Sequence, residues 1–152
     1  MTVTIASEPA DSAIAVQLIA ELEAYLVPMY PAESRHGYSV DKLLREGVVF
    51  FVVRCDGDVA GCGGVQLVGS EYGEIKRMYV RPVFRGRGLG RRMLDHLVAH
   101  TRGRGLARLR LETGIHQEEA IRLYESYGFT RIPPFGPYRE DPLSRYYEKV
   151  LD

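Results

Sequence analysis

Residues 85–91 read Arg85-Gly86-Arg87-Gly88-Leu89-Gly90-Arg91 and lie between a predicted strand and a predicted helix. Three alternating glycines allow the backbone of such a stretch to approach a ligand closely. Because the helix begins at once, its unpaired N–H groups and the positive end of its dipole face the loop. The arginines add charge-assisted hydrogen bonds. The stretch therefore predicts a cradle for a pyrophosphate, with a glycine-rich tight turn as the structural alternative.

Two widespread phosphate motifs do not fit this loop. A P-loop requires Gly-Lys-Ser/Thr after its spacer, and the chain contains no such sequence. The dinucleotide motif G-x-G-x-x-G fails because Arg91 occupies the place of its third glycine. What remains is the pattern R-x-x-G-x-G over residues 85–90.

The loop belongs to an alternation of strands and helices. Before it, Glu74 to Val80 alternates as a strand; after it, apolar residues at helical spacing predict a helix to about Arg102. The other predicted strands cover residues 2–6, 48–53, 59–68, 109–113, 130–135 and 144–151, and the other helices cover 12–26, 39–47 and 118–127. There is no repeat, low-complexity tract or linker, so residues 1–152 are predicted to form one α/β domain.

The composition is that of an ordinary globular protein of 152 residues, with 45% apolar and 26% charged side chains. Basic and acidic residues number 20 each, so a generally basic nucleic-acid coat is a poor fit. Residues 76–110 nevertheless hold 11 basic side chains and one acid, Asp95. Such a block indicates an anionic partner or a face that is paired with the acidic remainder of the chain.

The sequence has neither the pattern of a secretory signal nor an uncharged apolar run of the ~20 residues that a membrane helix needs. We therefore predict a cytoplasmic protein with reduced thiols and no membrane contact. Cys55 and Cys62 lack the spacing of a metal or redox site and are predicted to pack in the core. No histidine and carboxylate pair has metal-ligand spacing, so no metal is expected.

Together with its flanking segments, the glycine loop resembles the GNAT N-acetyltransferase superfamily. Arg85 to Gly90 is similar to the family's Q/R-x-x-G-x-G/A acetyl-CoA motif, and residues 78–82 (MYVRP) are similar to its fourth strand, which pairs with the pantetheine arm. Residues 120–129 (AIRLYESYGF) are similar to its second motif, in which the first tyrosine, here Tyr124, lies near the sulfur. The resemblance implies a mixed central sheet of about seven strands with about four helices, and acetyl-CoA as co-substrate.

The resemblance also implies which residues contact the cofactor. Gln117 stands where many members of the family have asparagine, and it is predicted to keep the bond to the pantetheine. The full set of predicted cofactor-binding residues is Met78, Tyr79, Val80, Arg85, Gly86, Arg87, Gly88, Leu89, Gly90, Arg91, Gln117 and Tyr124.

Tyr124 is the first candidate for a role in catalysis. The resemblance implies that its hydroxyl assists the departing thiolate, which a phenol with a pKa near ~10 can do by hydrogen bonding or proton donation. The alternative is a tyrosine that only packs in the core. The attacking amine must be neutral, yet an alkyl amine is mostly protonated at neutral pH, so a base is also required.

Two carboxylates are candidates for this base. Glu74 is similar in position to a glutamate that some members of the family use, and the alternative is a surface carboxylate paired with Lys76. Glu112, near the end of the strand at 109–113, is the second candidate, with a salt bridge to Arg110 or another arginine as its alternative. Strict alternation along 74–80 predicts that one face of the strand carries Glu74, Lys76, Met78 and Val80.

The resemblance places the acceptor pocket at the loop between the first two helices, where Glu33, Arg35 and His36 lie, with Tyr138 and Arg139 of the last loop beside them. This polar mixture suits a small zwitterionic acceptor better than a fatty one. Ordinary solvated loops are the alternative interpretation.

The sequence thus predicts an acetyl-CoA-dependent N-acetyltransferase that moves an acetyl group to a primary amine of a small molecule by direct attack in a ternary complex. The alternative is a non-catalytic module, either a CoA sensor or a basic-patch nucleic-acid binder. No nucleic-acid partner is expected, because the basic block has few aromatic residues for stacking. Dimers are frequent in the family, so a homodimer is compatible with the resemblance.

Overall fold

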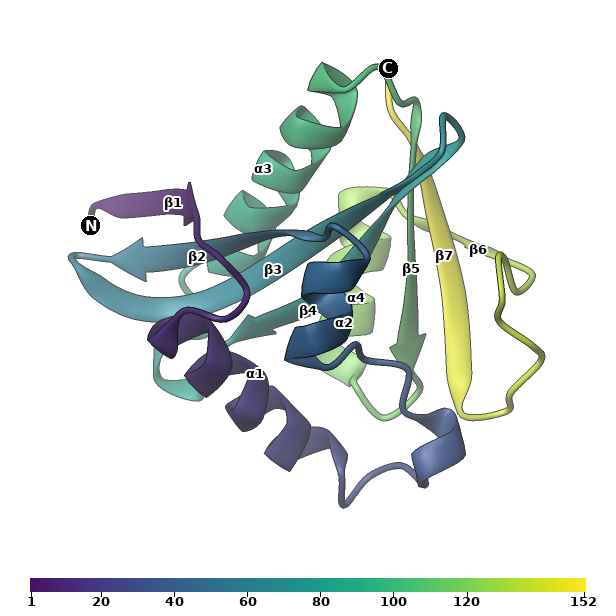
Figure 1. Ribbon diagram of the computed structural model, residues 1–152, viewed down its shortest axis with the longest axis horizontal. Helices are drawn as coiled ribbons and strands as arrows, with labels where there is room; N and C mark the ends of the chain where they lie inside the picture. Colours follow the sequence, from purple (N-terminus) through teal and green to yellow (C-terminus); the bar gives the residue numbers. More distant parts are fainter.

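In a computed structural model that describes residues 1–152, seven strands form one sheet in the order β1-β2-β3-β4-β5-β7-β6 (Figure 1). The strands are β1 (Val3–Ser7), β2 (Val49–Cys55), β3 (Asp58–Val68), β4 (Tyr72–Val80), β5 (Arg108–Gly114), β6 (Thr130–Ile132) and β7 (Ser144–Val150). The helices are α1 (Ala13–Leu26), α2 (Val40–Arg45), α3 (Leu89–Gly103) and α4 (Glu118–Tyr127). The mixed sheet with its four helices confirms the predicted fold class.

The centre of the sheet is where β4 and β5 separate. All other neighbouring strands pair antiparallel, whereas β4 and β5 run parallel and are paired only at Gly73 with Leu109 and at Glu74 with Arg110. Beyond these residues the two strands diverge (Figure 1). The second half of β4 therefore has no strand beside it on the β5 side, and its backbone polar groups there are available to a ligand.

Helices cover both faces of the sheet. On one face α3 and α4 enclose the larger apolar core, to which Leu94 and Tyr147 belong. On the other face α1 and α2 enclose a second core that includes Leu18 and Leu43. None of the helices combines the length and the apolar character that crossing a membrane requires.

Local sequence signals fix where several elements begin and end. Ser12 Oγ accepts a hydrogen bond from the Ala15 N–H at 3.1 Å and so caps α1. Gly128, with a φ of 114°, ends α4 in the left-handed conformation. β6 ends at Ile132, before the predicted limit, because Pro133 has no N–H to pair with a neighbouring strand.

A β-bulge interrupts β4. Arg77 has a positive φ of 54°, and the register between β3 and β4 shifts between Cys62 and Gly64. At this point two residues of β4 lie opposite one residue of β3. Side chains after the bulge therefore point to the opposite face from the one that strict alternation predicts.

The bulge corrects the prediction that the side chains of residues 74, 76, 78 and 80 share one face of the sheet. Lys76 and the bulged Arg77 both reach Tyr38, on the face that α1 and α2 cover. Met78 and Val80 instead pack against the core beneath α3. The prediction was wrong because it assumed an uninterrupted strand.

Candidate active site

A cavity of about 580 Å³ lies between the second half of β4, the glycine loop and the start of α4. All but one of the residues predicted to contact the cofactor line it. These are Met78, Tyr79, Val80, Arg85, Gly86, Gly88, Leu89, Gly90, Arg91, Gln117 and Tyr124. We refer to this space as the cofactor cavity.

The glycine loop leaves open space above its backbone. Gly86 and Gly88 have φ values of 80° and 76°, which residues with a side chain rarely adopt. A Cβ at either position would meet no atom within 4 Å. Gly88 is also the N-cap of α3 and has no side chain to accept a hydrogen bond, so the first N–H groups of this 15-residue helix keep no capping partner. The loop thus has the geometry of a backbone anion site.

The arginines of the loop have different surroundings. Arg85 and Arg91 line the cofactor cavity, and so does Arg122 of α4, which lies outside the predicted cofactor residues. Arg87 does not line it, because its guanidinium turns towards Cys55, with Nη1 3.7 Å from Sγ. Helix α1 also contributes Tyr25 to the lining of the cavity. No sequence pattern indicated that this tyrosine would contact a cofactor.

Tyr124 separates the cofactor cavity from a narrow cavity of about 90 Å³, since it lines both. The residue is only 6% exposed. Burial, with a smaller contribution from the charge of Glu112, raises the pKa of its hydroxyl well above the ordinary value of 10. The hydroxyl therefore stays protonated at neutral pH and can donate a hydrogen bond.

Glu112 faces the same narrow cavity from β5. Burial raises the pKa of its carboxyl to about 7, although the Ser144 Oγ–H, which donates a hydrogen bond to Oε2 at 2.9 Å, acts to lower it. The predicted alternative, a salt bridge with Arg110 or another arginine, is not formed. No arginine lies within salt-bridge distance of Glu112, and Arg110 Nε lies 2.7 Å from Glu148 Oε2. Glu112 is therefore a carboxyl group that exchanges a proton near neutral pH.

Glu74 lies in a buried polar cluster. It is 4% exposed, and its Oε2 lies 2.8 Å from Lys76 Nζ and accepts a hydrogen bond from the Tyr138 hydroxyl at 2.6 Å. Lys76 Nζ also donates to Tyr138 Oη at 3.0 Å and lies 3.8 Å from the centre of the Tyr38 ring. The alternative prediction of a pair with Lys76 is thus confirmed, but the pair is buried and not on the surface.

A third cavity, of about 800 Å³, lies between residues 31–38 and the loop that joins β6 to β7. Its lining is mostly polar and includes all the predicted acceptor residues, which are Glu33, Arg35, His36, Tyr138 and Arg139. We refer to it as the acceptor cavity. It shares Arg35, His36 and Lys76 with the narrow cavity, so the three cavities follow one another from the glycine loop to the last loop.

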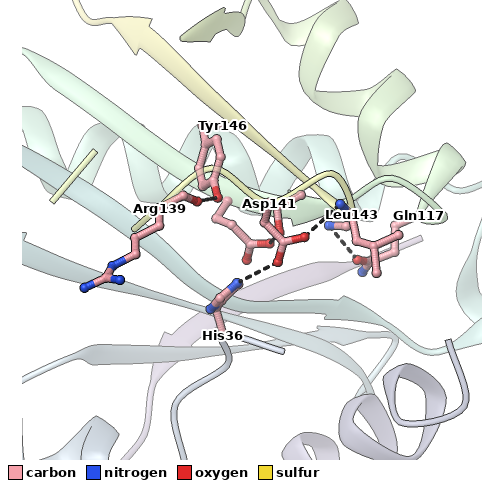
Figure 2. Close-up of polar contacts among 9 residues, drawn as sticks. His36, Gln117, Arg139, Asp141, Leu143 and Tyr146 are labelled. Atoms are coloured by element: carbon pink, nitrogen blue, oxygen red, sulfur yellow. Dashed lines mark hydrogen bonds and ion pairs between the residues drawn. The ribbon is translucent and has the colours of Figure 1, made fainter. Parts of the chain in front are cut away.

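Figure 2 shows how two loops meet at the acceptor cavity. His36 and Asp141 point towards one another, with Nε2 and Oδ2 3.8 Å apart. Asp141 Oδ1 accepts a hydrogen bond from the Leu143 N–H at 2.9 Å, and the Tyr146 hydroxyl donates to the Arg139 carbonyl at 2.7 Å. These bonds fix the loop backbone, while the Arg139 side chain extends away from them.

Gln117 lines both the cofactor cavity and the narrow cavity. Its Oε1 accepts a hydrogen bond from the Gly114 N–H at 3.1 Å, which closes the turn between β5 and α4 (Figure 2). The oxygen of this amide is engaged, so its amino group is the part that can reach a cofactor. No group of three or more histidine, cysteine, aspartate or glutamate side chains is arranged to hold a metal ion.

Comparison with known proteins agrees with this geometry. Residues 15–129 match the model of the acetyltransferase (GNAT) family. A protein of Azospirillum brasilense named IAA acetyltransferase is 45% identical over 150 residues, covering 98% of each chain. A Klebsiella pneumoniae structure provisionally named an acyl-CoA N-acyltransferase superposes with a TM-score of 0.82 at 35% identity, covering 99% of this chain and 98% of that one. An N-acetyltransferase of Thermoplasma acidophilum, solved in complex with coenzyme A, has the same fold with a TM-score of 0.78 at 18% identity, covering 99% and 100%.

Proposed function

Because the chain belongs to the GNAT family of acetyltransferases, we propose that it transfers the acetyl group of acetyl-CoA to a primary amine of a small molecule. One observation carries this proposal. The glycine loop opens on a cavity that continues, past Tyr124 and Glu112, into a polar cavity large enough for an acceptor. Two substrates bound in these cavities would meet at the narrow one, which suits direct attack in a ternary complex.

The residues of the cofactor cavity fit a coenzyme A thioester. The N–H groups at the start of α3 would bind the pyrophosphate, and the open space above Gly86 and Gly88 leaves room for its approach. Arg85 and Arg91 would add charge-assisted bonds. The unpaired edge of β4 offers backbone groups to the pantetheine amides. That the Thermoplasma relative binds coenzyme A supports the same cofactor here. The cofactor supplies an activated acetyl group.

The proposed reaction forms a C–N bond and breaks a C–S bond. Glu112 accepts the proton that the attacking amine loses, and its pKa of about 7 suits a base that works near neutral pH. A backbone N–H near Met78 stabilises the negative charge that develops on the carbonyl oxygen.

Tyr124 assists the departing sulfur in this proposal. A thiol has a pKa of about 8.5, and the pKa of Tyr124 is raised far above that value. Full proton transfer from the phenol to the thiolate would therefore be unfavourable. The hydroxyl stabilises the thiolate by donating a hydrogen bond while keeping its proton.

Glu74 is the less favoured base. Its Oε2 is engaged by both Lys76 and Tyr138, so the carboxylate already has strong partners that compete with an amine proton. We propose that it anchors Tyr138 in the wall of the acceptor cavity instead.

The test is the release of free thiol from acetyl-CoA as amines are added one at a time. The panel of amines should contain amino acids, polyamines and amino sugars. IAA, for which the Azospirillum relative is named, is assayed separately because it carries no primary amine. Amine-dependent thiol release with formation of the N-acetyl product is expected. If coenzyme A binds but no acceptor is acetylated, the protein is a CoA-binding module and the proposal fails.

The homodimer and the cytoplasmic location stay predictions from the sequence.

A further inference from the structure

The charged side chains at the inner part of the acceptor cavity are mostly paired with one another. Lys76 lies 2.8 Å from Glu74, and both side chains are 5% exposed. Arg77 Nη1 lies 2.8 Å from Glu23 Oε2. These pairs neutralise their charges within the protein, so they are not free to recognise a ligand.

Arg35 is paired less closely. Its Nη1 lies 3.9 Å from Glu23 Oε1, a carboxylate that already pairs more closely with Arg77. Its Nε is buried and has no hydrogen-bond partner. The side chain lines both the acceptor cavity and the narrow cavity and is 25% exposed. A guanidinium with unused donors at this junction is suited to a carboxylate, which accepts two parallel hydrogen bonds from it.

His36 is a second donor at the same place. It also lines both cavities, and its Nε2 is buried without a hydrogen-bond partner. The 3.8 Å to Asp141 is too long for a hydrogen bond. Two adjacent residues thus carry buried nitrogens without a hydrogen-bond partner, and the Nε–H of Arg35 favours a ligand that brings an acceptor.

The positions of Arg35 and His36 limit how far the carboxylate of the acceptor can lie from its amine. The amine must reach Glu112 in the narrow cavity, which at about 90 Å³ holds only a few non-hydrogen atoms. Arg35 and His36 stand at the boundary of that cavity. A carboxylate bound there is therefore separated from the amine by very few bonds, as in an α-amino acid. The rest of the molecule would lie in the polar acceptor cavity, which favours a polar side chain over an apolar one.

We infer that the acceptor is an α-amino acid with a polar side chain, its carboxylate bound by Arg35 with His36 as a second donor. This inference rests on the proposed acetyl transfer and names the substrate class for it.

The test compares each amino acid with its own primary carboxamide, for example serine with serinamide and glutamine with glutaminamide, at equal concentrations of uncharged amine. The two members of a pair differ only at the carboxylate, which the carboxamide replaces with an uncharged group of similar size that has one acceptor oxygen fewer. We expect kcat/KM to favour the amino acid by about tenfold or more. Amides acetylated as well as the acids would overturn the inference while leaving the proposed function intact. Failure of every amine to accept acetyl would overturn the proposed function and the inference with it.

Variants of Arg35 give a second test. Arg35→Gln should lower kcat/KM for the amino acid about 10²-fold through KM, and change the value for the amide less than about threefold. Arg35→Lys, which keeps the charge, should recover part of the loss. Arg54→Gln is the matched control, since Arg54 is similarly exposed, at 28%, but pairs with Glu8 away from the cavities. An unchanged thermal shift with coenzyme A shows that each variant is folded, and an equal loss for acid and amide would contradict the inference.

Discussion

At the scale of single residues, two carboxylates on neighbouring strands have opposite surroundings. Glu74 is paired with Lys76 inside a closed polar cluster, whereas Glu112 has a single hydroxyl donor and no cation within salt-bridge distance. Burial without a close cation raises the pKa of Glu112 to about 7. The same residue type is therefore fitted for proton exchange at one site and for anchoring at the other.

The substitution Glu112→Gln tests the proposed base. It keeps the size of the side chain but cannot accept a proton, so turnover should fall roughly 10²–10⁴-fold. In the parent enzyme kcat/KM should rise with pH through about 7, because the raised pKa of Glu112 leaves it protonated below that pH. The variant should lose this rise and regain activity only at high pH, where the amine is already neutral. A parental pH profile in the variant would exclude Glu112.

Glu74→Gln is the companion variant, and we expect it to act on stability. Breaking a buried ion pair leaves Lys76 charged without its partner and costs about 3–5 kcal/mol. The melting temperature should fall, and the pH dependence of kcat/KM should keep its parental midpoint. If Glu74→Gln, and not Glu112→Gln, shows a loss that high pH restores, Glu74 is the base.

Ser144→Ala tests how the base is tuned. The Ser144 hydroxyl donates to Glu112 and acts to lower the pKa of that carboxyl. Its loss should raise the pKa of Glu112, so the rise of kcat/KM should move to higher pH while the maximum at alkaline pH is retained. Ser144→Thr, which keeps the hydroxyl, should stay close to the parent. A uniform loss at all pH values would indicate a packing role only.

Tyr124→Phe removes the hydroxyl and keeps the ring that packs near Phe129. If the hydroxyl stabilises the thiolate only in the transition state, kcat and kcat/KM should fall together and the affinity for acetyl-CoA should hardly change. Tyr127→Phe, whose hydroxyl donates to Asp95 on the surface, is the control and should keep parental kinetics. Unchanged kinetics in Tyr124→Phe would remove this residue from the proposed mechanism.

At the scale of elements, the glycine loop and the start of α3 act together. Gly88 has a φ of 76°, and valine does not adopt this conformation without strain, so Gly88→Val should displace the N–H groups at the start of the helix. Calorimetry should show a severe loss of coenzyme A binding. Gly105→Val is the matched control, because Gly105 has a φ of 80° and open space around it but follows α3 at its other end. Equal binding in both variants would remove the loop from the cofactor site.

The elements were largely predictable from the sequence, because caps, glycines and prolines mark their ends. The bulge at Arg77 was not, since it depends on how β4 registers against β3 and no local pattern records it. The hydrogen bond between Ser144 and Glu112 could not be predicted for a similar reason. It joins β5 to β7, and it depends on how these two strands pair in the sheet. Side-chain directions were also beyond sequence reasoning, as Arg87 shows by turning to Cys55.

At the scale of the whole molecule, the basic block of residues 76–110 has two roles. Part of it neutralises acids elsewhere in the fold: Arg77 and Arg81 pair with glutamates of α1, and Arg108 and Arg110 pair with Glu148. Another part, Arg85 and Arg91, faces the cofactor cavity. Pairing with acids elsewhere in the chain is thus confirmed for part of the block. An anionic partner for the unpaired arginines stays a prediction.

The central claim is that two substrates occupy one continuous series of cavities that meet between Tyr124 and Glu112. A conjugate tests it directly, in which the amine nitrogen of the best acceptor is joined to the sulfur of coenzyme A through an acetyl bridge. Occupying both cavities with one molecule should lower Kd, measured by calorimetry, at least about 100-fold below that of coenzyme A alone. Glu112→Gln should still bind the conjugate tightly, because binding needs no proton transfer. A conjugate that binds no better than coenzyme A would contradict the account.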